Sequence, residues 1–161
     1  MKTVALISRP QKDEAGALAK ELIAAFPDRQ FLVEPHLASA IGVKGATDAE
    51  LGAAELVVIL GGDGTLIHGA RILRGRAVPI VGVNLGSLGF MTEIPVTEAV
   101  STLRQVFNGK AKIDARMKLT CKLFRGDVCV REDEVLNDVV INKSALAKIA
   151  ATELRTTLDD M

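Results

Sequence analysis

One stretch, residues 56–67, limits the possible folds of this chain more than any other. It begins with five consecutive apolar residues, 56–60, which predict a strand that is buried on both faces. Three glycines follow within four positions, at Gly61, Gly62 and Gly64, and an amphipathic segment comes next. A strand, a glycine turn and a helix in this order direct backbone N–H groups and a helix N-terminus toward an anion.

A carboxylate, Asp63, lies in the middle of this turn. A site that only holds phosphate would gain nothing from that charge, so Asp63 needs a donor: a substrate hydroxyl, a metal ion or backbone amides. The turn is not a P-loop, because no Lys-Ser/Thr pair follows it, and Ile67 stands where the dinucleotide fingerprint needs its third glycine. The alternative is an ordinary tight turn without a ligand. The position of the glycine turn at the carboxyl end of a central parallel strand favours a ligand site.

Strand and helix patterns alternate along the first 110 residues. Such alternation predicts a Rossmann-like α/β domain over residues 1–110, with a parallel sheet and helices on both of its faces. Between residues 36 and 55 we expect a loop with one short helix. Strands are expected at 3–8, 30–34, 56–60 and 78–83, and helices at 15–26, 48–53, 65–74 (with Thr65 as a candidate cap) and 97–107.

Beyond Gly109 the spacing of apolar residues changes from helical to alternating. Residues 118–123 and 128–131 predict two antiparallel strands around a turn, and residues 134–142 predict another strand. So few strands leave a sheet edge open. We therefore expect residues 111–161 to begin a β-rich domain that is truncated in this chain or completed by a partner.

The loop after the fourth strand, residues 84–90, is a second candidate binding segment. It starts with Asn84, and its glycines at Gly86 and Gly89 allow the backbone to approach a ligand closely. Phe90 is suited to covering a flat ring. The alternative is a flexible loop with Phe90 packed into the core.

A third candidate is the pair Asn137 and Asp138, which interrupts an otherwise apolar strand. An amide beside a carboxylate suits a vicinal diol such as a ribose. A β-bulge or a turn between two short strands is the alternative. His68 and Lys148 are ordinary surface residues unless a ligand lies near them.

The composition argues against several functions. Lys and Arg together number 20, as do Asp and Glu, and aromatic residues make up only 3% with no Trp or Tyr, so nucleic-acid binding is not expected. No apolar run approaches the ~20 residues of a membrane span, and no signal peptide is evident. We expect a cytoplasmic protein without a membrane partner, with Cys121 and Cys129 as reduced thiols and with no metal site built from cysteine and histidine.

With these pieces in one order, the sequence closely resembles the NAD kinase (ATP-NAD kinase) family. The glycine turn alone is shared with lipid kinases and phosphofructokinases, whereas the other two motifs at this spacing are much more specific. The resemblance extends over essentially the whole chain. The matching segments are residues 61–65, 81–90 and 136–143.

The resemblance implies transfer of the γ-phosphoryl group of ATP, or of polyphosphate, to the adenosine ribose 2′-hydroxyl of NAD, which gives NADP. Asp63 would accept the proton of the attacking hydroxyl or hold it for attack, and Mg²⁺ would offset the phosphate charge. The expected cofactor-binding residues are Gly61, Gly62, Gly64 and Thr65 at the phosphates, Asn84, Gly86 and Phe90 at the dinucleotide pocket, Asn137 and Asp138 at ribose hydroxyls of NAD, and His68 and Lys148 at NAD.

The family carries a further β-rich stretch beyond the point at which this chain ends. We therefore expect the 161-residue chain to be weakly active or inactive alone and its parent to be a kinase that forms a homodimer or homotetramer. One alternative is a nucleotide-binding fragment without catalysis. Another is a lipid kinase domain of the diacylglycerol type, although the loop that follows the fourth strand lacks the Gly-Thr-Gly-Asn-Asp pattern usual in such kinases.

Overall fold

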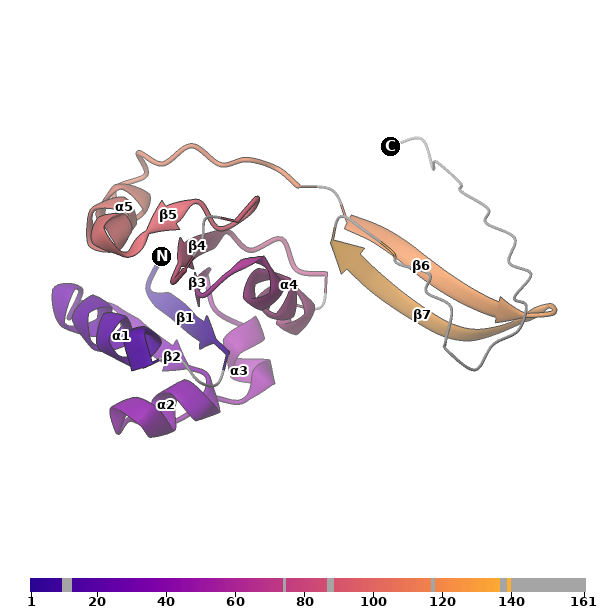
Figure 1. Ribbon diagram of the computed structural model, residues 1–161, viewed down its shortest axis with the longest axis horizontal. Coiled ribbons are helices and arrows are strands. Elements are labelled where there is room, and N and C mark those ends of the chain that lie inside the picture. Colours follow the sequence, from indigo (N-terminus) through magenta and orange to yellow (C-terminus); the bar gives the residue numbers. More distant parts are fainter. Residues whose placement is uncertain (10–12, 74, 87–88, 117, 137–138, 140–161) are drawn as a thin grey trace.

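The larger part of the molecule is a five-stranded parallel sheet in the order β2-β1-β3-β4-β5, covered by helices (Figure 1). This computed structural model describes residues 1–9, 13–73, 75–86, 89–116, 118–136 and 139. The predicted α/β fold is confirmed. The strands are β1 (Thr3–Ser8), β2 (Gln30–Val33), β3 (Leu56–Leu60), β4 (Ile80–Asn84) and β5 (Ile94–Pro95), and the helices are α1 (Asp13–Ala25), α2 (Pro35–Ile41), α3 (Asp48–Gly52), α4 (Asp63–Ile72) and α5 (Ala99–Phe107), which a short 3-10 helix, η1 (Val96–Glu98), precedes.

Both faces of the sheet are buried, which explains the continuous apolar strands. Along β1, Val4 and Leu6 pack into a cluster with α1, α2 and α5, while Ala5 and Ile7 pack into a second cluster with α3 and α4. Figure 1 shows α1 and α5 on one side of the strands and α3 and α4 on the other. A strand between two such clusters has no solvent-exposed side, so period-two alternation is absent from its sequence.

The strand order reverses between β1 and β3. From β1 the chain passes outward to β2, and from β3 it passes outward in the opposite direction to β4 and β5. Ser8 at the end of β1 pairs with Leu60 at the end of β3. The loops that leave these two strands therefore start side by side and diverge, which makes the crevice where open α/β sheets bind ligands.

Two expectations about helices are wrong. The predicted loop of residues 36–55 contains a helix, α2, whose first turn holds Pro35, where the missing N–H costs nothing, and which Gly42 ends with a φ of 76°. Thr65 is not a cap, because α4 begins at Asp63 with Gly62 as its N-cap. Asp63 thus lies in the first turn of a helix, where the helix dipole favours a negative charge.

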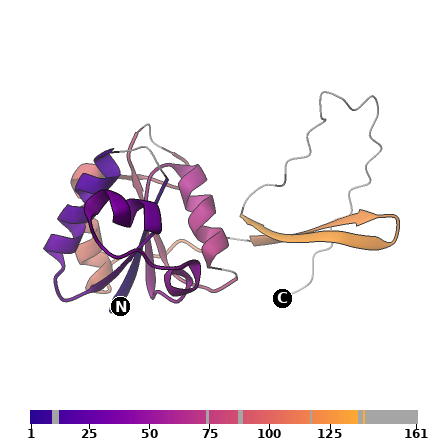
Figure 2. The ribbon, with the colours of Figure 1, turned by 90° about the horizontal axis from the view of Figure 1, so that it is seen from below.

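The β-rich segment starts with an antiparallel hairpin, β6 (Lys118–Arg125) and β7 (Val128–Leu136). The separate strand expected at 134–142 is wrong in its start, because β7 runs without interruption to Leu136. Leu136 packs against the cluster that contains α4, and the hairpin extends from that side of the sheet (Figure 2). Cys121 and Cys129 are free thiols.

Three predicted site residues, Asn137, Asp138 and Lys148, lie outside the described residues. Within the described part of the chain, no helix has the length and apolar character required to cross a bilayer.

Candidate functional site

Three loops meet at the carboxyl edge of the sheet. Arg9 follows β1, the glycine turn Gly61–Gly64 follows β3, and the loop 85–92 follows β4. Since β1, β3 and β4 are neighbours in the sheet, these loops lie next to one another. The structure thus brings the first two predicted motifs together at one edge.

The carboxylate of Asp63 joins the glycine turn to the loop after β4. Its Oδ1 accepts hydrogen bonds from the backbone N–H groups of Met91 (3.0 Å) and Thr92 (3.0 Å) and from the Thr92 hydroxyl (3.1 Å). Its Oδ2 accepts one from the N–H of Phe90 at 2.9 Å. Of the three kinds of partner considered from the sequence, backbone amides are the ones that Asp63 contacts here.

These donors keep Asp63 ionised. Burial by itself raises the pKa of the Asp63 carboxyl, but the hydrogen bonds from Phe90, Met91 and Thr92 outweigh that effect and hold the pKa below its ordinary value. Within the described residues, Oδ2 accepts a single hydrogen bond. A carboxylate oxygen has capacity for a second donor, so Oδ2 is the oxygen available to a ligand hydroxyl.

Gly89 makes this arrangement possible. A Cβ atom at position 89 would lie 2.3 Å from Asp63 Oδ1 and 2.7 Å from Thr92 Oγ1, closer than real Cβ atoms approach other atoms. The sequence singled out Gly89 only for closeness to a ligand and did not single out Thr92 at all. No local pattern could reveal them, because their partner is 26 or more residues away in the chain.

The loop after β4 is braced from within by Asn84. The Asn84 Nδ2 donates to the Thr92 backbone oxygen (3.1 Å) and hydroxyl (3.2 Å), and its Oδ1 accepts from the N–H of Gly86 (2.7 Å). Phe90 is 91% exposed, so the alternative in which its ring packs into the core is wrong. The proposed contact of each of these residues with a dinucleotide stays a prediction.

The glycines of the turn fall into two groups. A Cβ at Gly61 would lie 2.6 Å from the hydroxyl of the buried Thr65, so internal packing requires glycine there. A Cβ at Gly62 would have no neighbour within 4 Å, and one at Gly64 would meet only the Arg9 guanidinium, at 3.6 Å. The described residues therefore leave open space beside Gly62, while Gly64 lies in ordinary van der Waals contact with the Arg9 guanidinium.

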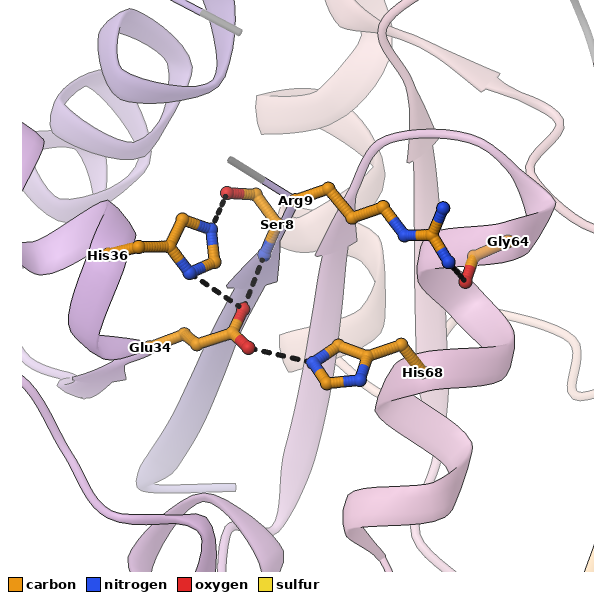
Figure 3. Close-up of polar contacts among 6 residues, drawn as sticks. All are labelled: Ser8, Arg9, Glu34, His36, Gly64 and His68. Atoms are coloured by element: carbon orange, nitrogen blue, oxygen red, sulfur yellow. Dashed lines mark hydrogen bonds and ion pairs between the residues drawn. The ribbon is translucent and has the colours of Figure 1, made fainter. Parts of the chain in front are cut away.

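A second polar cluster lies beside this turn (Figure 3). The buried Glu34 accepts from the N–H of Ser8 at 3.1 Å and from His68 Nε2 at 2.8 Å, and His36 Nδ1 is 3.8 Å from the same carboxylate. His36 Nε2 in turn is 3.1 Å from Ser8 Oγ. Both histidines of the chain thus converge on one carboxylate, and one nitrogen of the predicted NAD-binding residue His68 is already engaged.

A hollow of about 490 Å³ lies on the other side of the loop after β4. The hollow is lined by Glu14, Asn84, Leu85, Gly86, Pro95 and Val96.

Within the described part of the chain, no group of three or more His, Cys, Asp or Glu side chains is placed to hold a metal ion.

A parallel α/β sheet with a glycine turn and an ionised carboxylate at its switch point defines an α/β protein with a nucleotide-type site. The ATP-NAD kinase N-terminal domain matches residues 4–111 of this chain. The chain therefore belongs to the ATP-NAD kinase family, which confirms the resemblance inferred from the three motifs.

Curated relatives agree with this assignment. The chain is 44% identical to the NAD kinase of Geobacter metallireducens over 95% of its own length and 45% identical to that of Trichlorobacter lovleyi over 99%. It spans 55% and 57% of the lengths of these two relatives. The fold is also that of yeast NADH kinase, solved in complex with NADH, with a TM-score of 0.74 and 22% identity over 84% of this chain and 46% of that one.

Proposed function

We propose that the protein of which this chain is a part is an NAD kinase, which transfers the γ-phosphoryl group of ATP to the adenosine ribose 2′-hydroxyl of NAD. The observation that carries the proposal is Asp63, an ionised carboxylate held beside an open glycine turn in a member of the ATP-NAD kinase family. The relatives named NAD kinase support the same activity.

Asp63 serves this reaction by holding the attacking hydroxyl. Its Oδ2 has room for one donor, while Oδ1 is fully used by the loop after β4. Because hydrogen bonds lower the pKa of Asp63, it is a weak base, suited to orienting the hydroxyl rather than removing its proton early. Phosphoryl transfer asks mainly for such positioning and for charge stabilisation.

The glycine turn holds the phosphate donor. The N–H groups of Gly62 and Gly64 and the N-terminus of α4 suit an anion, and the open space beside Gly62 admits a phosphate to close range, whereas the Gly61 N–H already donates to the Val83 carbonyl. When bound, Mg²⁺ would offset the remaining charge of the donor phosphates, which would be its main ligands, since Mg²⁺ needs only one or two protein carboxylates. Thr65, which is buried against Gly61, is the further phosphate-binding residue of this turn in the proposal.

The rest of the proposal extends the family resemblance. Asn84, Gly86 and Phe90 border the dinucleotide, His68 contacts NAD, and Asn137, Asp138 and Lys148 complete the NAD site. The whole protein acts in the cytoplasm as a homodimer or homotetramer, and the 161-residue chain alone is weakly active or inactive.

The test replaces Asp63 by asparagine in the full-length protein. Asp63→Asn keeps an oxygen for Met91 and Thr92 but loses the charge and one acceptor, so NADP formation should fall by about 10²-fold or more while ATP binding is retained. Coupled-enzyme measurement of NADP gives the rate, and calorimetry gives ATP affinity. Asp114→Asn, at an exposed aspartate, is the matched control.

Three results would contradict the proposal. An Asp63→Asn enzyme with nearly normal turnover would show that Asp63 does not hold the hydroxyl. Phosphorylation of diacylglycerol in preference to NAD would favour the lipid kinase. Binding of ATP and NAD without NADP formation by the full-length protein would favour a non-catalytic nucleotide-binding role.

A further inference from the structure

Arg9 lies at the switch point but belongs to none of the predicted motifs. It directly follows β1, whose last residue, Ser8, pairs with Leu60 immediately before the glycine turn. The Arg9 side chain reaches across this point, and its Nη2 donates to the Gly64 carbonyl at 3.3 Å (Figure 3). Arg9 thus lies on the β1 side of the crevice, and the glycine turn after β3 forms the other side.

The guanidinium lies flat against Gly64. Its Cζ, Nη1 and Nη2 are each 3.6 Å from the position that a Cβ of Gly64 would take. The contact with the carbonyl is long and exposed, and it uses one of the five N–H donors of an arginine. Among the described residues the other donors make no hydrogen bond, so they remain available at the mouth of the turn.

An arginine that binds no ligand is electrostatically unfavourable at this position. The N-terminus of α4 carries a partial positive charge, which favours anions and disfavours cations. Within the described residues Arg9 has no carboxylate partner, and Asp63, the one acidic residue in the first turn of α4, is turned to the loop after β4. A cation and a helix N-terminus therefore lie beside the same turn, and an anion with several negative charges would offset both.

We propose that Arg9 is a binding residue for the phosphate chain of the phosphoryl donor. The planar guanidinium offers two parallel N–H groups, which match two phosphate oxygens, and Gly64 provides the flat surface on which it rests. The proposal rests on the proposed function for the identity of the donor. It adds a residue that directly follows β1 to a site otherwise made by the loops after β3 and β4.

Titration calorimetry on the 161-residue chain tests it with three ligands: ATP, inorganic tripolyphosphate and NAD. Arg9→Gln removes the charge, and Arg9→Lys keeps the charge without the fork. Because a charged hydrogen bond contributes about 1.5–3 kcal/mol, Arg9→Gln should weaken the binding of ATP and of tripolyphosphate about tenfold or more. Arg9→Lys should weaken their binding less, and the affinity for NAD should change less than twofold in both variants. The exposed Arg71, in the last turn of the same helix, supplies the control Arg71→Gln, which should leave all three unchanged.

The proposal would be overturned if the wild-type chain did not bind ATP, or if Arg9→Gln and Arg71→Gln lost equal affinity for ATP. It would also be overturned if Arg9→Gln lost affinity for ATP but not for tripolyphosphate, which would place Arg9 at the adenosine. Equal losses of affinity for NAD and ATP would overturn it as well and would place Arg9 at the acceptor. A full-length protein that forms NADP normally with Arg9→Gln, at an unchanged KM for ATP, would also reject Arg9 while the proposed function stands. If the full-length protein makes no NADP but Arg9→Gln still loses tripolyphosphate binding, the assignment of Arg9 stands and the proposed kinase function is rejected.

Discussion

Single glycines decide the geometry of this site, and they do so for different reasons. Gly89 makes room for the Asp63 carboxylate, and Gly61 makes room for Thr65. Gly64 accommodates no protein atom at less than 3.6 Å. Glycine has a lower helix propensity than alanine, and no clash with another part of the protein requires it at position 64 in the first turn of α4. The contact with the Arg9 guanidinium and the close approach of a ligand are the remaining reasons for it.

Alanine at these positions should separate the two reasons. Gly89→Ala forces Asp63 and Thr92 apart and should lower the free energy of unfolding by about 1–3 kcal/mol. Gly64→Ala makes only an ordinary contact and should leave stability unchanged or raise it by up to about 1 kcal/mol, while it weakens ATP binding. Denaturant unfolding and calorimetry measure the two effects. Destabilisation of Gly64→Ala together with normal ATP binding would reverse this interpretation.

At the scale of elements, Glu34 ties together three segments that the chain keeps apart. Its carboxylate contacts Ser8 at the end of β1, His36 on α2 and His68 on α4. The helix that carries Asp63 is therefore linked through Glu34 to β1, which Arg9 directly follows. A bond of this kind fixes the spacing between the two sides of the crevice.

Removal of this carboxylate should loosen the linkage. Glu34→Ala leaves the buried N–H of Ser8 without its acceptor, which should cost about 1–3 kcal/mol of unfolding free energy. Glu34→Gln retains an acceptor oxygen and should cost less. Urea unfolding of the two variants beside the wild type provides the measurement. Equal stability of Glu34→Ala and the wild type would show that the N–H finds water or another partner.

The sequence predicted the elements better than it predicted the contacts between them. The continuous apolar run 56–60 identified β3 because both faces of the sheet are covered. Helix α2 was missed because Pro35 and small residues in this region resemble a loop, and β5, at two residues, is too short to have a pattern. The glycine turn was recognisable locally, whereas the Asp63 to Thr92 and Glu34 to His68 contacts join residues 29 and 34 positions apart.

The whole molecule divides into parts of very different burial. The β3 strand of the parallel sheet is fully buried, while the hairpin exposes most of β6 and β7, including Leu123 and Phe124. A two-stranded hairpin has marginal stability in water. The hairpin therefore depends on its contact with α4 in this chain.

Hydrogen exchange should report this division directly. Backbone amides of β1 and β3 should exchange only through global unfolding, whereas those of β6 and β7 should exchange at least about 10²-fold faster through local opening. Mass spectrometry of peptides from residues 56–60 and 118–136 measures both sets in one sample. Equal protection of the two sets would show that the hairpin is as cooperative as the sheet.

The bonds between Asp63 and the loop after β4 also connect the evolutionary histories of their residues. Glycine at position 89 leaves room for both the Asp63 carboxylate and the Thr92 hydroxyl, and among the described residues Asp63 accepts the hydrogen bond of that hydroxyl. A lineage that exchanged Asp63 for a neutral side chain would lose part of the selection that keeps both residues. A descendant that had given up the chemistry would therefore show the change first as drift at positions 89 and 92, in a loop that a comparison of the turn alone would overlook.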